Sequence, residues 1–194
     1  MKASNPLPVP APEAWAAVLG GDRLALEALC TDWSPIVVQW CARLGGPRVD
    51  AEQAAQEVFI VLLRRLNTID GPEKLSAWLF AVTRRVLAQQ RRLAWGARWE
   101  PEADADRLGG GPSPGHAAVD SASTGVAVRA MIAELPPPLR EVLVLCDLDE
   151  RTDDDVAALL GVPAGTVKSR LRRARFMLRD MASARGILPT GESR

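Results

Sequence analysis

The sequence has few of the residues that build metal sites or disulfide frameworks. Among its 194 residues there are one histidine and three cysteines. Cys30, Cys41 and Cys146 show no C-x-x-C spacing, and their odd number leaves one thiol without an intramolecular partner. We therefore expect no bound metal and no cofactor, and we expect reduced, buried thiols of the kind found in the cytosol.

Net charge and long apolar runs are also missing. The 24 basic and 24 acidic side chains cancel, and the pI is about 6.6. This balance excludes a uniformly basic nucleic-acid-binding coat but not a local basic patch. No stretch approaches the roughly 20 apolar residues that span a bilayer, and the Pro-rich residues 1–12 lack the apolar segment of a signal peptide. We expect a cytoplasmic protein.

Catalytic constellations are equally scarce. No nucleophile lies beside a base in a recognisable motif, and the glycines at 109–111 are not followed by the Lys-Ser/Thr pair of a phosphate-binding loop. The sequence therefore predicts that the protein is not an enzyme and has no small-molecule substrate.

Apolar residues repeat every three or four positions, which predicts helices, and no segment has the alternation of a strand. The first predicted helices cover 13–19, 22–44, 50–66 and 73–95. We expect Pro35 to bend or split the second of them.

Acids and a Gly-Pro cluster interrupt this pattern at 99–125, which indicates a flexible linker. We predict an all-α fold of two small helical domains. The predicted divisions are a disordered tail (1–12), a first domain (13–98), the linker (99–125), a second domain (126–185) and a disordered tail (186–194).

The second domain contains a helix-turn-helix pattern. Thr152 and the following acids predict the start of one helix, Gly161 its left-handed end, and a last helix runs from 164 to about 184. The last helix has one apolar stripe (Val167, Leu171, Ala174 and Leu178), and the other positions from 168 to 179 are mostly Lys or Arg, with no acid. Such a helix fits the DNA major groove, although a solvated basic face is the alternative.

Several short sequence motifs resemble those of the sigma-70 family of bacterial RNA polymerase sigma factors, most closely its extracytoplasmic-function (ECF) branch. Leu159–Pro163, Gly165–Leu171 and Arg173–Arg175 resemble sigma domain 4. Asp50–Phe59 resembles the core-binding helix of sigma domain 2, and Ala77–Phe80 resembles the helix that follows. The family usually has Asn where Arg85 stands and Asp where Gln89 stands, so promoter preference is open.

The resemblance implies a transcription initiation factor that binds core RNA polymerase and directs it to promoters. The residues implied for contact with the core clamp are Asp50, Glu52, Gln53, Gln56 and Glu57. Those implied for the melted −10 element are Arg84, Arg85, Gln89, Gln90, Arg91 and Arg92. Trp95 and Trp99 could stack on unpaired bases or pack against protein, and Trp78 is expected in the core.

For the −35 duplex, the resemblance implies base contacts by Lys168, Ser169, Arg172 and Arg173. Phosphate contacts are expected from Thr166, Arg170, Arg175 and Arg179. The implied partners are promoter DNA, the clamp of the largest polymerase subunit, the flap of the second, and an anti-sigma factor that can hold such proteins at the inner membrane. Two alternatives stay open: an operator-binding helix-turn-helix regulator, and a sigma-like interaction protein without promoter activity.

Overall fold

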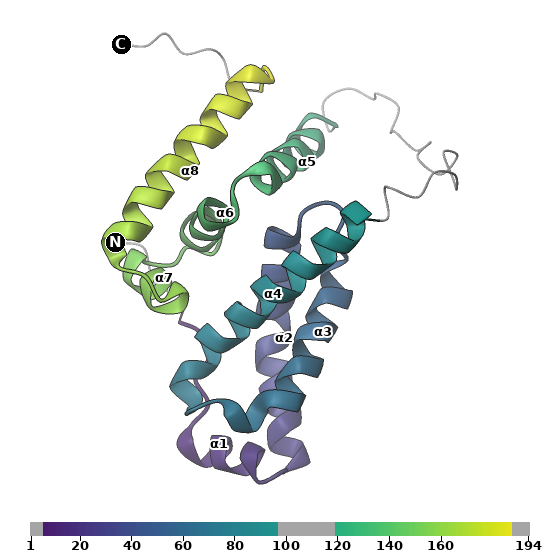
Figure 1. The fold of residues 1–194 in the computed structure, drawn as a ribbon, viewed down its shortest axis with the longest axis vertical. Helices are drawn as coiled ribbons and strands as arrows, with labels where there is room; N and C mark the ends of the chain where they lie inside the picture. Colours follow the sequence, from purple (N-terminus) through teal and green to yellow (C-terminus); the bar gives the residue numbers. More distant parts are fainter. Residues whose placement is uncertain (1–5, 97–118, 188–194) are drawn as a thin grey trace, which may run out of the picture.

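The structure, a computed structural model, describes residues 6–96 and 119–187, and over these ranges the chain is helical without a strand (Figure 1). The first half comprises α1 (Pro12–Leu19), α2 (Arg23–Gly45), α3 (Ala51–Arg65) and α4 (Leu75–Gly96). The second half comprises α5 (Val119–Glu134), α6 (Pro137–Leu143), α7 (Asp153–Leu160) and α8 (Ala164–Ala184). The all-α prediction is confirmed, and none of the described helices is long and apolar enough to cross a membrane.

Side-chain caps fix where several helices begin. The Asp50 carboxylate accepts hydrogen bonds from the amides of Glu52 and Gln53 at 2.9 and 3.0 Å, and so satisfies donors that have no partner inside α3. Asp22 does the same for α2. The prolines that open α1 and α6 stand in the first turn, where a missing N–H costs nothing.

Helix α2 contains a proline that was predicted to bend or split it. Pro35 lies inside α2, which runs from Arg23 to Gly45 as a single helix, so of the two predicted outcomes, a bend or a split, the split does not occur. The residues around it, Trp33, Val37 and Trp40, are almost fully buried. Their packing offsets the helix bond that proline cannot make.

Three boundaries also differ from the prediction. Helix α5 begins at Val119, inside the segment predicted as a linker; residues 97–118 of that segment lie outside the described residues. Residues 120–125 carry no large apolar side chain, so the sequence shows no helical period there. At the N-terminus, Leu7 packs against the core although it belongs to the predicted tail. At the C-terminus, Gly186, the first residue of the other predicted tail, ends α8 in a left-handed conformation.

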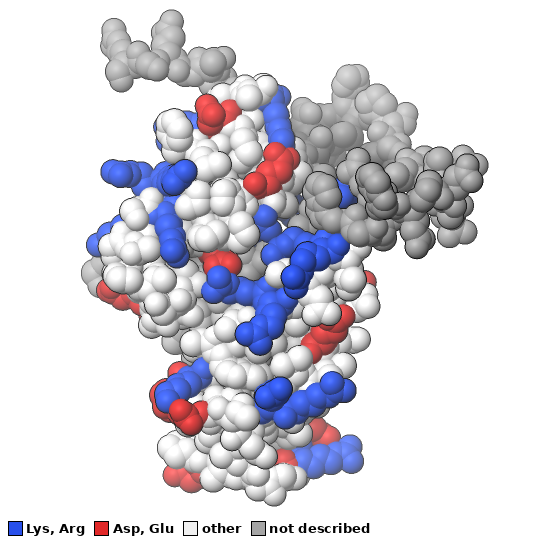
Figure 2. Space-filling view, viewed as in Figure 1, with Lys and Arg blue, Asp and Glu red and all other residues white. Residues whose placement is uncertain are grey.

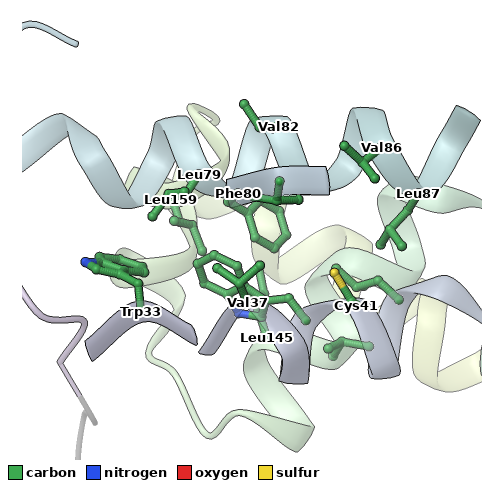
Figure 3. Packing of buried hydrophobic residues seen from close by; sticks show 14 of the residues in the cluster. Trp33, Val37, Cys41, Leu79, Phe80, Val82, Val86, Leu87, Leu145 and Leu159 are labelled. Atoms are coloured by element: carbon green, nitrogen blue, oxygen red, sulfur yellow. The ribbon is translucent and has the colours of Figure 1, made fainter. Parts of the chain in front are cut away.

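The core of the first half is formed by α2, α3 and α4. Trp40 meets Phe80 edge to face, with ring centroids 5.0 Å apart and planes at 89°, a favourable aromatic geometry. The same apolar cluster continues into the second half. Figure 3 shows Leu145 and Leu159, from the second half, in the cluster that contains Val37 and Phe80. The two halves therefore share one buried core.

Candidate nucleic-acid interface

The ends of the helices in the helix-turn-helix are set by capping residues that can be identified in the sequence. Thr152 accepts a hydrogen bond from the Asp155 amide, and the Asp155 carboxylate binds back to the Thr152 amide, which completes a capping box. At the other end of α7, Gly161 has φ 65° and ψ 38°, a conformation that a residue with a Cβ adopts only with strain. The chain then turns into α8 at Ala164, as predicted.

Helix α8 divides into a buried and an exposed face. Val167, Leu171 and Ala174 are buried, as the apolar stripe predicts. The four side chains predicted to contact bases, Lys168, Ser169, Arg172 and Arg173, are all exposed. The structure thus brings them onto one accessible surface, and Figure 2 shows basic side chains in this part of the molecule and over the first half.

The side chains predicted to contact phosphates are less uniform. Arg179 is exposed, whereas Thr166 and Arg170 are half-buried. Arg175 donates to both carboxylate oxygens of Asp147, at 2.9 and 2.5 Å, and this hydrogen-bonded pair raises the pKa of the guanidinium. Arg175 is therefore already engaged by an acid that precedes the helix-turn-helix.

Phe176 is a surface feature that the sequence analysis missed. It stands on α8 one turn after Arg172 and is 67% exposed. It lines a groove of about 790 Å³ between α8 and the start of α6, together with Pro136, Pro138 and several of the predicted DNA-contacting residues. The sequence did carry a signal for this feature, because Phe176 is an aromatic residue outside the apolar stripe of a basic helix.

Five of the six predicted −10 residues fall into two groups. Arg85 and Gln89 are exposed and line a groove of about 560 Å³ between α3 and α4. Trp78 forms part of its wall, half-buried against the core, so it serves both the packing that was predicted and an accessible surface. Arg64 and Arg65, at the end of α3, add positive charge that the sequence analysis did not assign.

The second group is held by other parts of the protein. Arg84 pairs with Glu141 at 2.7 Å, Arg91 donates to the Leu44 carbonyl at 2.9 Å, and Gln90 donates to Glu57 at 3.0 Å. Burial lowers the pKa of Arg91. Arg92 is exposed. The side chain of Trp95 and all of Trp99 lie outside the described residues.

Helix α3 presents the surface predicted to contact polymerase. Glu52, Gln53 and Gln56 are exposed, whereas Glu57 is half-buried and Asp50 is occupied as the helix cap. Ile60 and Leu63 continue the row from Gln53 and Gln56 at helical spacing and are 48% and 51% exposed. The surface thus has a polar start and an apolar end, and sequence analysis found only the polar part.

No group of three or more metal-binding side chains comes together within the described part of the chain. Cys41 and Cys146 are buried, Cys30 is half-buried, and none of the three is in a disulfide. Burial raises the pKa of Cys41 to about 12, so this thiol stays protonated near neutral pH.

Comparisons with known proteins agree with the resemblance seen in the sequence motifs. The family model described as Sigma-70 region 2 matches residues 29–96, and the one described as Sigma-70, region 4 matches residues 125–178. A similar protein is the ECF RNA polymerase sigma factor SigE of Mycolicibacterium smegmatis, 34% identical over 82% of this chain and 63% of the relative, so the chain spans less than two thirds of that protein. Another is the RNA polymerase sigma-E factor of Streptomyces coelicolor, 30% identical over 86% of this chain and 91% of the relative.

Solved structures show the same fold. CnrH in complex with the cytosolic domain of CnrY has a TM-score of 0.62 and 22% identity, covering 89% of this chain and 96% of that one. The sigma factor RpoE in complex with the anti-sigma factor NepR, from Bartonella quintana, has a TM-score of 0.56 and 20% identity, covering 81% and 96%. With both halves matched and relatives similar over most of its length, the chain belongs to the sigma-70 family of RNA polymerase sigma factors, in the ECF branch.

Proposed function

We propose that this chain is a transcription initiation factor that binds core RNA polymerase and directs it to specific promoters. The observation that carries the proposal is the exposed basic face of α8 in a capped helix-turn-helix, on a chain whose other half matches sigma region 2. Such a factor acts in the cytoplasm, on the nucleoid when it is bound to polymerase.

In this proposal α8 enters the major groove of the −35 duplex. Lys168, Arg172 and Arg173 are exposed on the face opposite the buried stripe, and Arg forks can bind guanine O6 and N7 together. Ser169 lies beside them. Phe176 follows on the same face and offers an apolar surface to a thymine methyl group. Arg179 and Arg170 neutralise phosphates.

The groove between α3 and α4 is proposed to hold unpaired bases of the −10 element. Trp78 supplies an aromatic wall for stacking, and Arg85 and Gln89 supply donors at the rim. A stacked base is worth about 1–3 kcal/mol, and the surrounding arginines attract the backbone.

The exposed row on α3 is proposed to bind the polymerase clamp. Its polar start suits a basic partner helix, and Ile60 and Leu63 give the apolar area that an interface core needs. Anti-sigma factors are bound by one of the similar solved proteins. We propose the same class of partner here.

The test of the function is to mix the purified chain with bacterial core RNA polymerase, follow co-elution, and then transcribe genomic fragments. We expect co-elution and discrete new start sites. Leu63→Asp should abolish co-elution, whereas Leu24→Asp, at a 76% exposed site on α2, should not. Salt-sensitive DNA binding by the free chain without binding to core would instead identify an operator-binding regulator.

The DNA contacts are tested at the promoter that this screen identifies. Arg172→Ala or Arg173→Ala should cost about 1–3 kcal/mol at the matched −35 sequence. Arg179→Ala should weaken binding of matched and scrambled sequences equally. Equal losses for all three variants on both sequences would refute the assignment of base contacts.

A further inference from the structure

A smaller groove borders α8 on the side where α7 lies beside it (Figure 1). We call it the α7–α8 groove. Its volume is about 430 Å³, and it is lined by Asp153 at the start of α7 and, on α8, mainly by the basic residues Lys168, Arg172, Arg175 and Arg179. Asp153 is the one acidic side chain among the described residues that line it.

The groove lies next to the face of α8 that is proposed to read the −35 duplex. Lys168 and Arg172 are two of the four predicted base contacts, and both line this groove. Arg172 and Phe176 also line the larger groove beside α6, so they form the ridge between the two grooves. A base edge held by Lys168 or Arg172 therefore lies near Asp153.

The Asp153 carboxylate has no strong partner within the described part of the chain. It is half-buried, and the hydrogen bond identified for it comes from the Cys146 thiol, a weak donor, with Sγ and Oδ1 3.8 Å apart. Arg175 is close enough for its charge to interact with Asp153, but its guanidinium donates to both oxygens of Asp147. The Oδ2 atom of Asp153 is thus able to accept a hydrogen bond from a ligand in the groove.

The start of α7 does not by itself explain an acid at position 153. The capping box is formed by Thr152 and Asp155, without Asp153. An acid in the first turn also favours a helix through its dipole, but Asp154, which is exposed and does not line the groove, supplies the same effect. Asp153 differs from its two acidic neighbours in facing the groove beside the predicted base contacts.

The chemistry of the major groove limits what such a carboxylate can bind. An ionised carboxylate only accepts hydrogen bonds, so it repels phosphates and the base edges that present acceptors. Guanine presents N7 and O6, and thymine presents O4. Adenine offers its N6 amino group, but the acceptor N7 lies beside it. Cytosine offers its N4 amino group beside a C–H, so it is the base that suits a carboxylate.

We propose that Asp153 is a specificity-determining residue of the −35 interface, whose carboxylate accepts a hydrogen bond from the N4 amino group of a cytosine. Its position beside Lys168 and Arg172 brings it to a base edge, and their charges offset its repulsion of the DNA backbone. The inference deepens the proposed promoter function and rests on it, because that function supplies the duplex.

The test uses the full chain bound to core RNA polymerase and a library of promoter fragments whose −35 element is randomised. The fragments that are retained are sequenced. We expect the wild type to prefer cytosine at one position by about tenfold, the order of a single base contact. Asp153→Ala should reduce this preference to below about threefold and leave the other positions unchanged.

Asp153→Asn makes the prediction sharper. An asparagine adds an N–H donor beside its acceptor oxygen, and this pair matches N7 and N6 of adenine. The preference at the same position should therefore move from cytosine to adenine. The matched control is Asp154→Ala, which removes the same charge from the same turn of α7 and should keep the cytosine preference. Circular dichroism checks that α7 remains folded in each variant.

A wild-type motif without cytosine overturns the inference, and so does an unchanged cytosine preference in Asp153→Ala. Equal loss of the preference in Asp154→Ala also overturns it, because the charge at the start of α7 would then be responsible instead of an accepted hydrogen bond. Failure of the proposed function has a different signature: the wild-type chain would bind no core polymerase or would select no −35 sequence at all, and the inference would fall with it.

Discussion

Arg140 is the residue whose loss should most reveal how the second half is assembled. Its side chain is buried, and its guanidinium donates to the carbonyls of Ile132, Leu135 and Leu44 at 3.1, 3.0 and 3.1 Å, and also to Ala133. Leu44, Ile132 and Ala133 lie in the last turns of α2 and α5, where carbonyls lack an α-helical partner, although the Ile132 carbonyl also accepts from the Leu135 amide. A cation there is also favoured by the helix dipole.

The charge persists despite its burial. Burial, and the positive charge of Arg91 nearby, lower the pKa of Arg140 to about 10, while Glu141 acts in the opposite direction. At neutral pH the guanidinium is therefore ionised, and each hydrogen bond it donates is charge-assisted.

Arg140→Ala removes all four hydrogen bonds and leaves the carbonyls partly shielded from water. Hydrogen bonds to charged groups contribute about 1.5–3 kcal/mol each but do not add, and breaking a buried ionic network costs about 3–5 kcal/mol. With about 3 kcal/mol as the working value, a cooperative unit of about 150 residues should lose roughly 6–12 °C in Tm. Arg140→Lys should fall between the two proteins, since an ammonium lacks the planar fork.

The assay is thermal unfolding followed by circular dichroism at several protein concentrations. Arg129→Ala is the control, because Arg129 lies on α5 and is exposed, and its loss should cost less than about 0.5 kcal/mol. If Arg140→Ala melted within about 2 °C of the wild type, the view that this guanidinium completes two helix ends would be refuted.

Three further outcomes are expected. Thr152→Ala removes half of the capping box and should lower the free energy of unfolding by about 1 kcal/mol in a denaturant titration. Cys41 should resist alkylation at pH 8 in the folded protein and react after unfolding, as mass spectrometry can show, because burial raises its pKa to about 12. Burial also raises the pKa of Glu141 above its ordinary 4.5, more than Arg84 lowers it. The folded state then binds this proton more tightly than the unfolded state, so this contribution to stability should decrease as pH rises from about 4.5 through the raised pKa, and Glu141→Gln should remove that slope.

The helix-turn-helix was predictable because its signals are local. The Thr152 cap, the Gly161 end and the apolar stripe of α8 all lie within one short stretch, and each has a direct physical meaning in sequence. The same holds for Asp50 at the start of α3. The structure confirms these elements.

The contacts between the halves were not predictable for the opposite reason. Arg43 and Asp149 are more than one hundred positions apart, and neither stands in a pattern that names its partner. Arg84 and Arg91 looked like free positive charge, but Arg84 pairs with Glu141 of α6 and Arg91 donates to the Leu44 carbonyl at the end of α2. Burial of Arg140 likewise depends on how helix ends meet in space, which periodicity does not report.

The pair between Arg175 and Asp147 has a consequence for how binding to DNA responds to ionic strength. A basic side chain releases condensed counterions from DNA only when it contacts a phosphate. Each such contact makes the fall of log K with log salt concentration steeper by about 0.9 on duplex DNA. Arg175 is already neutralised by a carboxylate of its own chain. While that pair persists in the complex, α8 displaces fewer cations from the duplex than its number of arginines implies, and the salt dependence of promoter binding is correspondingly shallower.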